Sequence, residues 1–339
     1  MMMTAALCHR YGPPESLRLA EVPQPRPRRG EVLIRVQAAG VTSGDARIRG
    51  AQVPAGMGPL IRLAFGLRGP RRPVLGREFA GVIEAHAPDQ SEALAASLPP
   101  GTAVFGITPG MRMGAHAEYL CLPADGLLLP RPADMSIETA AGFFFGGLTA
   151  ADFLLDQCAL QPRERVLVVG ATGAVGTAAV QIARAHGAQV TALASAGNLE
   201  LARQLGAETL LDYRHDRLEG QWDVILDIPG VLANARQHLA RGGRLGLVTA
   251  TLGQTLRANL RPGGPVRAGV ISETPAAMAR LLGLYHAGAY RPLIGATLPF
   301  NRIQEAHALA SSGHKRGNVV VVMDPAAGAA LAAPVRATS

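Results

Sequence analysis

Three glycines at positions 170, 173 and 176 form the pattern in this chain with the clearest chemical meaning. They follow the apolar run 165–169 and lead into an amphipathic segment that extends to residue 186. Glycines let a backbone approach a pyrophosphate, and the free N–H groups at a helix start attract that anion. The pattern predicts a nucleotide-binding turn formed by Gly170, Ala171, Thr172, Gly173, Ala174, Val175 and Gly176.

A plain strand-to-helix turn without a ligand is the alternative interpretation of these glycines. The strict G-x-G-x-x-G spacing ending at Gly176 places its first glycine at position 171. Ala171 stands there, with Gly170 just before it. A nucleotide-binding turn in this chain must therefore tolerate one methyl group.

Short strands and helices alternate from residue 165 onwards. The expected strands are 165–169, 189–194, 209–212, 223–227, 244–249 and 267–271, and the expected helices are 174–186, 199–205 and 232–239. Six short strands linked in this way predict an α/β fold with an open parallel sheet covered by helices.

The first part of the chain is rich in expected strands instead. Strands separated by turns are expected within residues 4–40, with a loop at 40–45 and further strands near 102–106 and 115–122. The long connection 51–73 contains an apolar stretch around Phe65. It is open whether this stretch is a short buried helix or a lid over a pocket.

Size and composition limit the classes of protein. A chain of 339 residues suits two domains, and no apolar run approaches the ~18 residues of a membrane span. The net charge of +8 comes from dispersed arginines without interleaved aromatics, so we expect a solvated surface and no nucleic-acid face. No export signal is evident, and three widely spaced cysteines favour a reduced, cytoplasmic setting.

Several segments occur together in the order of a known family. They are 11–15, 40–45, 75–81, 117–119, 147–150, 170–176, 205–207, 211–213 and 313–317. The chain resembles the medium-chain dehydrogenase/reductase superfamily, above all its zinc-independent quinone oxidoreductase-like branch. The resemblance implies a Rossmann doubly wound parallel sheet inserted into a GroES-like β-barrel catalytic domain. The expected boundaries are 1–125 and 273–330 for the catalytic domain, 126–272 for the NADP-binding domain and 331–339 for a flexible tail.

The resemblance also predicts that this chain holds no metal. Zinc-dependent relatives place a cysteine where Thr42 stands, a histidine where Arg77 stands and a further ligand near 143–147. Hydroxyl, guanidinium and aromatic groups do not make a tetrahedral zinc site. Oxidation of simple alcohols then loses its Lewis acid, whereas reduction of a quinone or conjugated enone does not need one.

The choice of cofactor follows from charge. NAD-binding turns usually end their second strand with an acid for the ribose 2′-hydroxyl, but here Ser195 ends that strand and no acid appears before Glu200. We therefore predict NADPH. By resemblance, Arg184 and Tyr213 contact the 2′-phosphate, although Arg184 also fits a solvated helix residue. Ser195 either bonds the phosphate or caps the next helix.

Three side chains are predicted around the reacting atoms. The family counterpart of Thr42 lies by the nicotinamide, so its hydroxyl is a candidate donor to the acceptor carbonyl; a loop threonine bonding its own backbone is the alternative. Phe145 and Phe65 are expected to line an apolar pocket. Glu78 is expected to be structural, paired with Arg77.

These features predict an NADPH-dependent reductase that acts on a small apolar quinone or α,β-unsaturated carbonyl. A metal-free alcohol or aldehyde reductase shares the same cofactor site. An NADPH-binding sensor or interaction protein with little turnover is the alternative from another class. A homodimer through the strand 267–271 is expected from the family.

Overall fold

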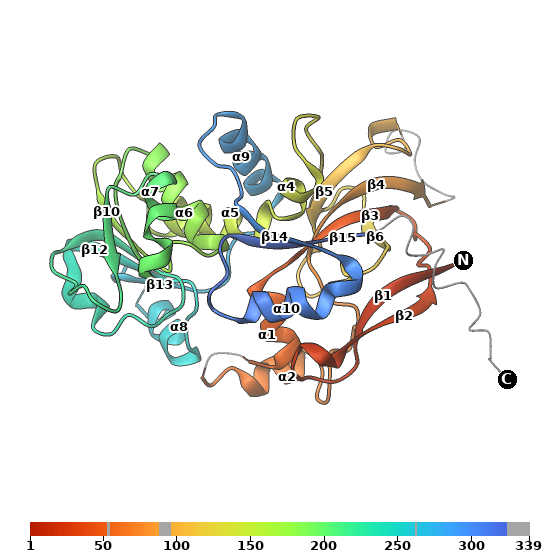
Figure 1. The fold of residues 1–339 in the computed structure, drawn as a ribbon, viewed down its shortest axis with the longest axis horizontal. Helices are drawn as coiled ribbons and strands as arrows, with labels where there is room; N and C mark the ends of the chain where they lie inside the picture. Colours follow the sequence, from red (N-terminus) through yellow and green to blue (C-terminus); the bar gives the residue numbers. More distant parts are fainter. Residues whose placement is uncertain (53–54, 88–95, 262, 324–339) are drawn as a thin grey trace.

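The computed structural model describes residues 1–339 except 53–54, 88–95, 262 and 324–339. Two sheets lie along the long axis of the molecule, with helices between them (Figure 1). One sheet is parallel and comes from the middle of the chain. The other is mostly antiparallel and takes strands from both ends.

The parallel sheet has the strand order β10-β9-β8-β11-β12-β13. Its strands are β8 (Arg165–Val169), β9 (Gln189–Ala194), β10 (Thr209–Asp212), β11 (Trp222–Asp227), β12 (Leu239–Leu247) and β13 (Val266–Ala268). The chain runs outward from β8 in one direction to β10 and then from β11 in the other. In open α/β sheets, ligands bind at the carboxyl ends of strands where the order reverses. The predicted parallel sheet is confirmed.

The second sheet has the order β14-β15-β3-β4-β5-β7, and β6 also pairs with β3. Its strands are β3 (Glu31–Val41), β4 (Glu78–His86), β5 (Ala103–Ile107), β6 (Tyr119–Pro123), β7 (Leu128–Pro130), β14 (Ile294–Pro299) and β15 (Asn318–Val322). A ribbon of β1 (Met2–Cys8) and β2 (Leu17–Pro23) lies beside it. Because β15 pairs with β3, the returning chain completes the sheet that the first part began.

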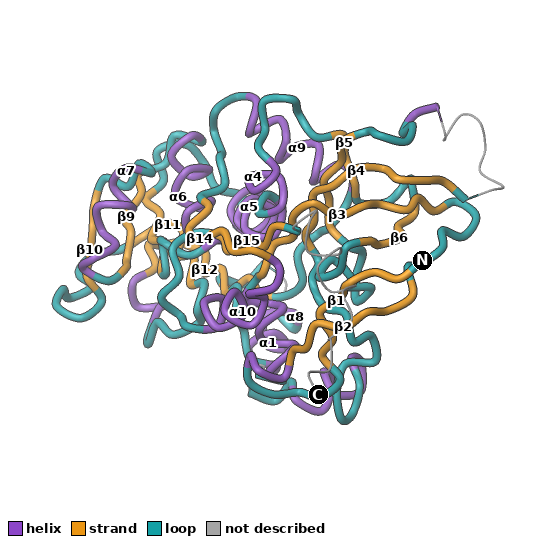
Figure 2. The backbone as a smooth tube through the Cα atoms, turned by 45° about the vertical axis from the view of Figure 1, so that its right-hand side comes forward, coloured by secondary structure: helices purple, strands orange, loops and turns teal. Residues whose placement is uncertain are grey.

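Helices connect and cover the two sheets. The parallel sheet carries α6 (Ala174–Ala185), η3 (Ala196–Asn198), α7 (Leu199–Gln204), η4 (Ala235–His238) and α8 (Leu252–Asn259). Between the sheets in both views lie α4 (Ile137–Ala141), α5 (Phe144–Ala151) and α9 (Pro275–His286), with η2 (Asp152–Gln157) continuing α5 (Figure 2). The second sheet carries η1 (Pro14–Ser16), α1 (Ser43–Gly50), α2 (Gly58–Phe65), η5 (Phe300–Arg302) and α10 (Ile303–Ser311).

Some element boundaries differ from the sequence prediction. The loop expected at 40–45 ends in α1, because Thr42 and Asp45 cap a helix there. The helix expected at 232–239 is only the short η4, and α8 was not predicted at all. The predicted domain boundaries stay predictions, as does the homodimer through the edge of the sheet at β13. The predicted tail 331–339 lies outside the described residues.

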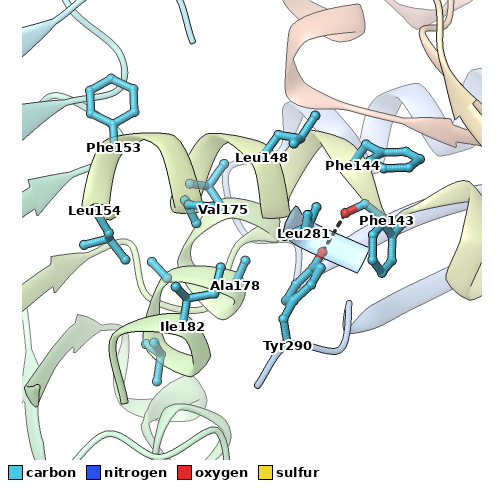
Figure 3. Packing of buried hydrophobic residues seen from close by; sticks show 14 of the residues in the cluster. Phe143, Phe144, Leu148, Phe153, Leu154, Val175, Ala178, Ile182, Leu281 and Tyr290 are labelled. Carbon is cyan, nitrogen blue, oxygen red and sulfur yellow. Dashed lines mark hydrogen bonds between the residues drawn. The ribbon is translucent and has the colours of Figure 1, made fainter. Parts of the chain in front are cut away.

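The largest core joins the two sheets through α5. Leu148, Phe153 and Leu154 lie on α5 and η2, and Val175 and Ile182 come from the facing helix α6 (Figure 3). The close contact of the two helices depends on glycine, since a Cβ on residue 146 would lie 2.5 Å from the oxygen of Ala174. Among the described residues, no helix combines the length and apolar character that crossing a membrane requires.

Three consecutive phenylalanines mark the start of α5. Phe143 and Phe144 are fully buried and pack around Phe105, whose ring stacks on that of Phe144 at 4.8 Å. Tyr290 donates a 2.7 Å hydrogen bond to the Phe143 oxygen (Figure 3). Phe145 is only partly buried. Two rings of the triplet therefore belong to the core, and the third is free for another role.

We predict that Phe144→Ala lowers the free energy of unfolding by about 3–5 kcal/mol, since it leaves a cavity beside Phe105. Phe145→Ala is the matched control and costs clearly less, because its ring is partly exposed. Urea unfolding followed by circular dichroism measures both. Equal losses for the two variants would contradict this description of the core.

Candidate active site

One cavity of about 630 Å³ opens at the carboxyl ends of β8, β9 and β11. Its lining comes from the parallel sheet and its loops, from α1 and α5, and from the loop before β15. The residues are Ser43, Arg47, Phe145, Val169, Gly170, Thr172, Gly173, Ala174, Val175, Leu193, Ala194, Ser195, Asn198, Tyr213, Asp216, Leu218, Ile228, Pro229, Val231, Leu232, Ala310, Gly313, His314 and Lys315. The cavity thus lies at the position where an open α/β sheet binds its ligand.

The glycine turn has the geometry of a phosphate cradle. Gly170 has φ +79°, a conformation that strains residues with a side chain. The methyl group of Ala171 is fully buried, which is how the turn tolerates it. A Cβ on Gly176 would lie 2.1 Å from the Gly170 oxygen, so this glycine permits close packing of helix on turn. Ala171 and Gly176 shape the turn without lining the cavity.

The first turn of α6 leaves its N–H groups available. Gly173 is the N-cap, and no side chain caps the helix. A Cβ at Gly173 would point into open space, with nothing nearer than 3.9 Å. Unpaired N–H groups and the positive end of the helix dipole favour a bound anion at this point. The residues present therefore fit the pyrophosphate of a dinucleotide.

A loop from the far end of the chain closes over this turn. The Gly317 N–H donates to the Thr172 oxygen at 2.8 Å. Lys315 lines the cavity beside the turn, and burial lowers its pKa while the charges of Glu78 and Asp45 oppose that change. The sequence analysis matched residues 313–317 to the family but gave them no place in the cofactor site, because they lie far from the turn in the chain.

Arg316 in the same loop reaches the carboxyl end of β9. Its guanidinium donates to the Asn198 oxygen at 2.6 Å and to the Gly197 oxygen at 2.8 Å. Asn198 also donates to Ser195 at 3.1 Å. Ser195 and Tyr213 line the cavity there, as the sequence predicted. Their roles stay predictions.

Arg184 does not lie in this site. It occupies the last turn of α6, about 15 Å along the helix from the phosphate end. Its side chain is exposed and extends over Gly206, where a Cβ would lie 2.1 Å from Arg184 Cδ. The prediction that Arg184 contacts a 2′-phosphate is therefore corrected. A basic residue near β9 comes from the loop at Arg316 instead.

The two predicted pocket phenylalanines lie in different hollows. Phe145 lines the cavity next to the glycine turn. Phe65, at the end of α2, lines a separate hollow of about 440 Å³ with Pro109 and Met111. The turn after α2 folds back on itself, since Arg71 N–H donates to the Phe65 oxygen at 2.6 Å. The prediction for Phe65 is therefore wrong.

Thr42 serves the backbone of α1 and does not line the cavity. Its hydroxyl donates to Asp45 Oδ2 at 2.6 Å and accepts the Asp45 N–H at 3.1 Å. The single hydroxyl proton is thus already used, so the predicted donor role towards an acceptor carbonyl is corrected. The T-x-x-D pattern of a capping box was readable in the sequence.

Glu78 and Arg77 are not paired with each other, contrary to the prediction. Glu78 is 2% exposed and accepts the N–H groups of Phe144 and Phe145, each at 2.7 Å. Burial raises its pKa to about 7, although these hydrogen bonds act to lower it. Arg77 makes a bidentate ion pair with Glu273, at 2.9 and 2.6 Å. Glu78 thereby joins β4 to α5, and Arg77 joins the start of β4 to the segment between β13 and α9.

Arg47 is a further cavity residue that the sequence prediction missed. It lies one helical turn after Ser43, which lines the cavity as well. Recognising α1 would have placed both side chains on one face. In the described ranges, no group of three or more His, Cys, Asp or Glu residues is arranged to hold a metal ion. The donor set at Thr42 and Arg77 does not fit zinc.

Comparison with known proteins places this geometry in a family. Residues 28–133 match the model of the alcohol dehydrogenase GroES-like domain, and residues 205–321 match that of the zinc-binding dehydrogenases. The chain is 30% identical to the quinone oxidoreductase of Sus scrofa, covering 90% of this chain and 93% of the relative. It belongs to the medium-chain dehydrogenase/reductase superfamily. The predicted resemblance and fold class are thereby confirmed.

Other relatives agree with this assignment. The chain is 29% identical to the mitochondrial NAD(P)H oxidoreductase RTN4IP1 of Drosophila melanogaster, over 92% of this chain and 84% of that protein. A mycobacterial protein solved in complex with NADPH has a TM-score of 0.77 and 26% identity, covering 94% of this chain and 99% of that one. The quinone oxidoreductase of Coxiella burnetii shares the fold, with a TM-score of 0.82 at 24% identity over 96% of this chain and all of that one.

The buried carboxyl of Glu78 predicts an unusual dependence of stability on pH. Its pKa rises from 4.5 when unfolded to about 7 when folded. Between these values the unfolded chain releases the proton while the folded one keeps it, so stability falls as pH rises. Relative to Glu78→Gln, the wild type should lose about 3 kcal/mol from pH 4.5 to 7.

Urea unfolding at a series of pH values measures this difference. The exposed Glu219→Gln variant is the matched control and should follow the wild-type curve. Parallel curves for the wild type and Glu78→Gln across this range would show that the carboxyl ionises normally in the folded protein.

Proposed function

We propose that this oxidoreductase uses NADPH to reduce a quinone or an α,β-unsaturated carbonyl without zinc. The observation that carries the proposal is a single cavity that combines a phosphate cradle with an apolar wall. The cradle is the turn from Gly170 to Gly173, and the wall includes Phe145 and Ile228. A dinucleotide bound at the turn reaches from β9 towards this wall.

A preference for NADPH is supported by charge at the carboxyl end of β9. Arg316 is exposed and is held there by the cavity residue Asn198 and by Gly197, and Tyr213 lines the cavity. The cavity-lining acid among the described residues is Asp216, which is exposed and accepts the Asp212 N–H at 2.7 Å. A 2′-phosphate would therefore meet a guanidinium, with the carboxylate engaged by its own backbone. The NADPH complex of the mycobacterial relative is consistent with this choice.

When bound, NADPH supplies a hydride to the β-carbon of the acceptor. The electron pair of the double bond moves onto the carbonyl oxygen, and water returns a proton to the α-carbon. The chain's own residues bind and orient: the α6 amides hold the pyrophosphate, and Phe145 offers an apolar face to the acceptor. Glu78 fixes the backbone that carries Phe145.

A reaction without zinc is supported by the residues at the two positions where zinc ligands would be expected, because both side chains already have other partners. Thr42 caps α1, and Arg77 is bound to Glu273. A quinone or conjugated enone already carries an activated electron-poor carbon, so it can accept hydride without a Lewis acid. A simple aldehyde lacks that activation, which favours the proposal over an aldehyde reductase.

We predict that the purified protein oxidises NADPH with a quinone or an enone and reacts much more slowly with a simple aldehyde. A zinc chelator should leave the rate unchanged. The fall in NADPH absorbance measures the rate with the quinone, the enone and the aldehyde, and the rate in the presence of the chelator. Binding of NADPH without consumption of any acceptor would replace the reductase proposal with the sensor alternative. Loss of activity in chelator would contradict zinc independence.

We predict that Arg316→Ala raises the dissociation constant of NADPH roughly tenfold and leaves that of NADH nearly unchanged, because it removes a charge-assisted contact to the 2′-phosphate. Arg184→Ala is the matched control and should alter neither constant. Cofactor fluorescence titration measures both. Tighter binding of NADH than NADPH by the wild type would overturn the preference itself.

A further inference from the structure

Arg47 brings an unpaired positive charge into the apolar end of the cavity. It is half-buried on α1, and within the described part of the chain its guanidinium makes one hydrogen bond, to Thr249 Oγ1 at 3.1 Å. Among the described residues, no carboxylate lies within 4.0 Å of it. Burial lowers its pKa. A guanidinium in this position has several N–H donors left for a ligand.

Some buried or partly buried arginines in this chain are neutralised by a carboxylate, whereas others, such as Arg49 and Arg267, have none within 4.0 Å among the described residues. Arg77 makes a bidentate pair with Glu273, and Arg244 makes one with Glu164 at 2.8 and 2.7 Å. Their side chains are 21% and 18% exposed. Removing a charge from water is costly unless a counter-charge compensates it. Arg47 lacks such a counter-charge among the described residues, and unlike Arg49 and Arg267 it lines the cavity, where a ligand can supply one.

The position of Thr249 indicates which half of the cavity Arg47 faces. Thr249 follows β12, on the opposite side of β8 from β9 and β10. The adenosine half of a dinucleotide lies towards β9, and its pyrophosphate has the α6 amides and Lys315. Arg47 therefore faces the half of the cavity that holds the reacting ends. Phe145 lies close to the same face of α1, since a Cβ on Gly44 would lie 3.5 Å from its ring.

We propose that Arg47 binds a carboxylate of the acceptor, so that the substrate class is α,β-unsaturated carbonyls bearing a carboxylate. This inference rests on the proposed function and specifies its substrate. The fork of a guanidinium matches a carboxylate in a bidentate manner. A permanent carboxylate neutralises Arg47 throughout the bound complex, whereas an oxyanion that forms only during hydride transfer does not. Thr249 is a positioning residue that holds the fork towards the cavity.

Binding is tested first, without any turnover. Calorimetric titration of the NADP⁺-loaded protein compares levulinate, the saturated keto acid, with its methyl ester. The wild type should bind levulinate more tightly than the ester. Arg47→Gln should weaken levulinate binding roughly 10- to 100-fold and leave the ester within about twofold. The exposed Arg184→Gln removes the same charge outside the cavity and should change neither.

Turnover is tested next with the conjugated keto acid acetylacrylate and its methyl ester. The ratio of kcat/KM between acid and ester cancels their different intrinsic reactivity when variants are compared. Arg47→Gln should lower this ratio roughly 10- to 100-fold, and Arg47→Lys should restore part of it because the charge returns. Thr249→Val should lower it by a smaller factor. The KM for NADPH should stay constant throughout.

Two outcomes would overturn the inference. Wild-type protein that binds levulinate no better than its ester has no carboxylate subsite. A weaker affinity for NADPH in Arg47→Gln, with the acid-to-ester ratio unchanged, would assign Arg47 to the cofactor. If levulinate binding depends on Arg47 while no acceptor is reduced, the subsite stands and the proposed reductase function fails.

Discussion

The rest of this structure depends on one buried carboxyl group, that of Glu78. It comes from the first residue of β4 and accepts the first N–H groups of α5, whose own N-cap residue, Phe143, has no side-chain oxygen to accept them. α5 in turn packs on α6 so closely that Gly146 has no room for a side chain beside Ala174. The second sheet is thereby linked, through one helix, to the start of α6. The direction of the α6 amides is thus set from the other part of the molecule.

A second constraint comes from the end of the chain. β15 must pair with β3 to complete the second sheet, and the loop before it therefore has to pass the glycine turn. The hydrogen bond from Gly317 to Thr172 fixes that passage, and with it Lys315 and Arg316. The cofactor site is consequently not a property of the parallel sheet alone. Its basic residues, Lys315 and Arg316, lie in the loop that leads into β15, a strand of the second sheet.

Structure that depends on residues close together in the chain could be predicted from the sequence. The glycine turn, β8 and α6 are continuous in the chain, so their pattern predicts their structure. The prediction for Arg184 was wrong because this residue lies in the last turn of α6, about 15 Å along the helix from the phosphate-binding end. Arg47 and Arg316 were missed because their neighbours, Thr249 and Asn198, become neighbours only on folding.

The two positions where the resemblance expects zinc ligands, Thr42 and Arg77, carry residues with structural roles. Thr42 makes the capping box that starts α1, and that helix presents Arg47 to the cavity. Arg77 joins the start of β4 to Glu273, in the segment that leads into α9. Restoring a histidine at position 77 would leave Glu273 half-buried without its partner, and such a charge is costly. Thr42 and Arg77 therefore each have a structural role, and introducing a metal ligand at position 77 would require a compensating change at Glu273.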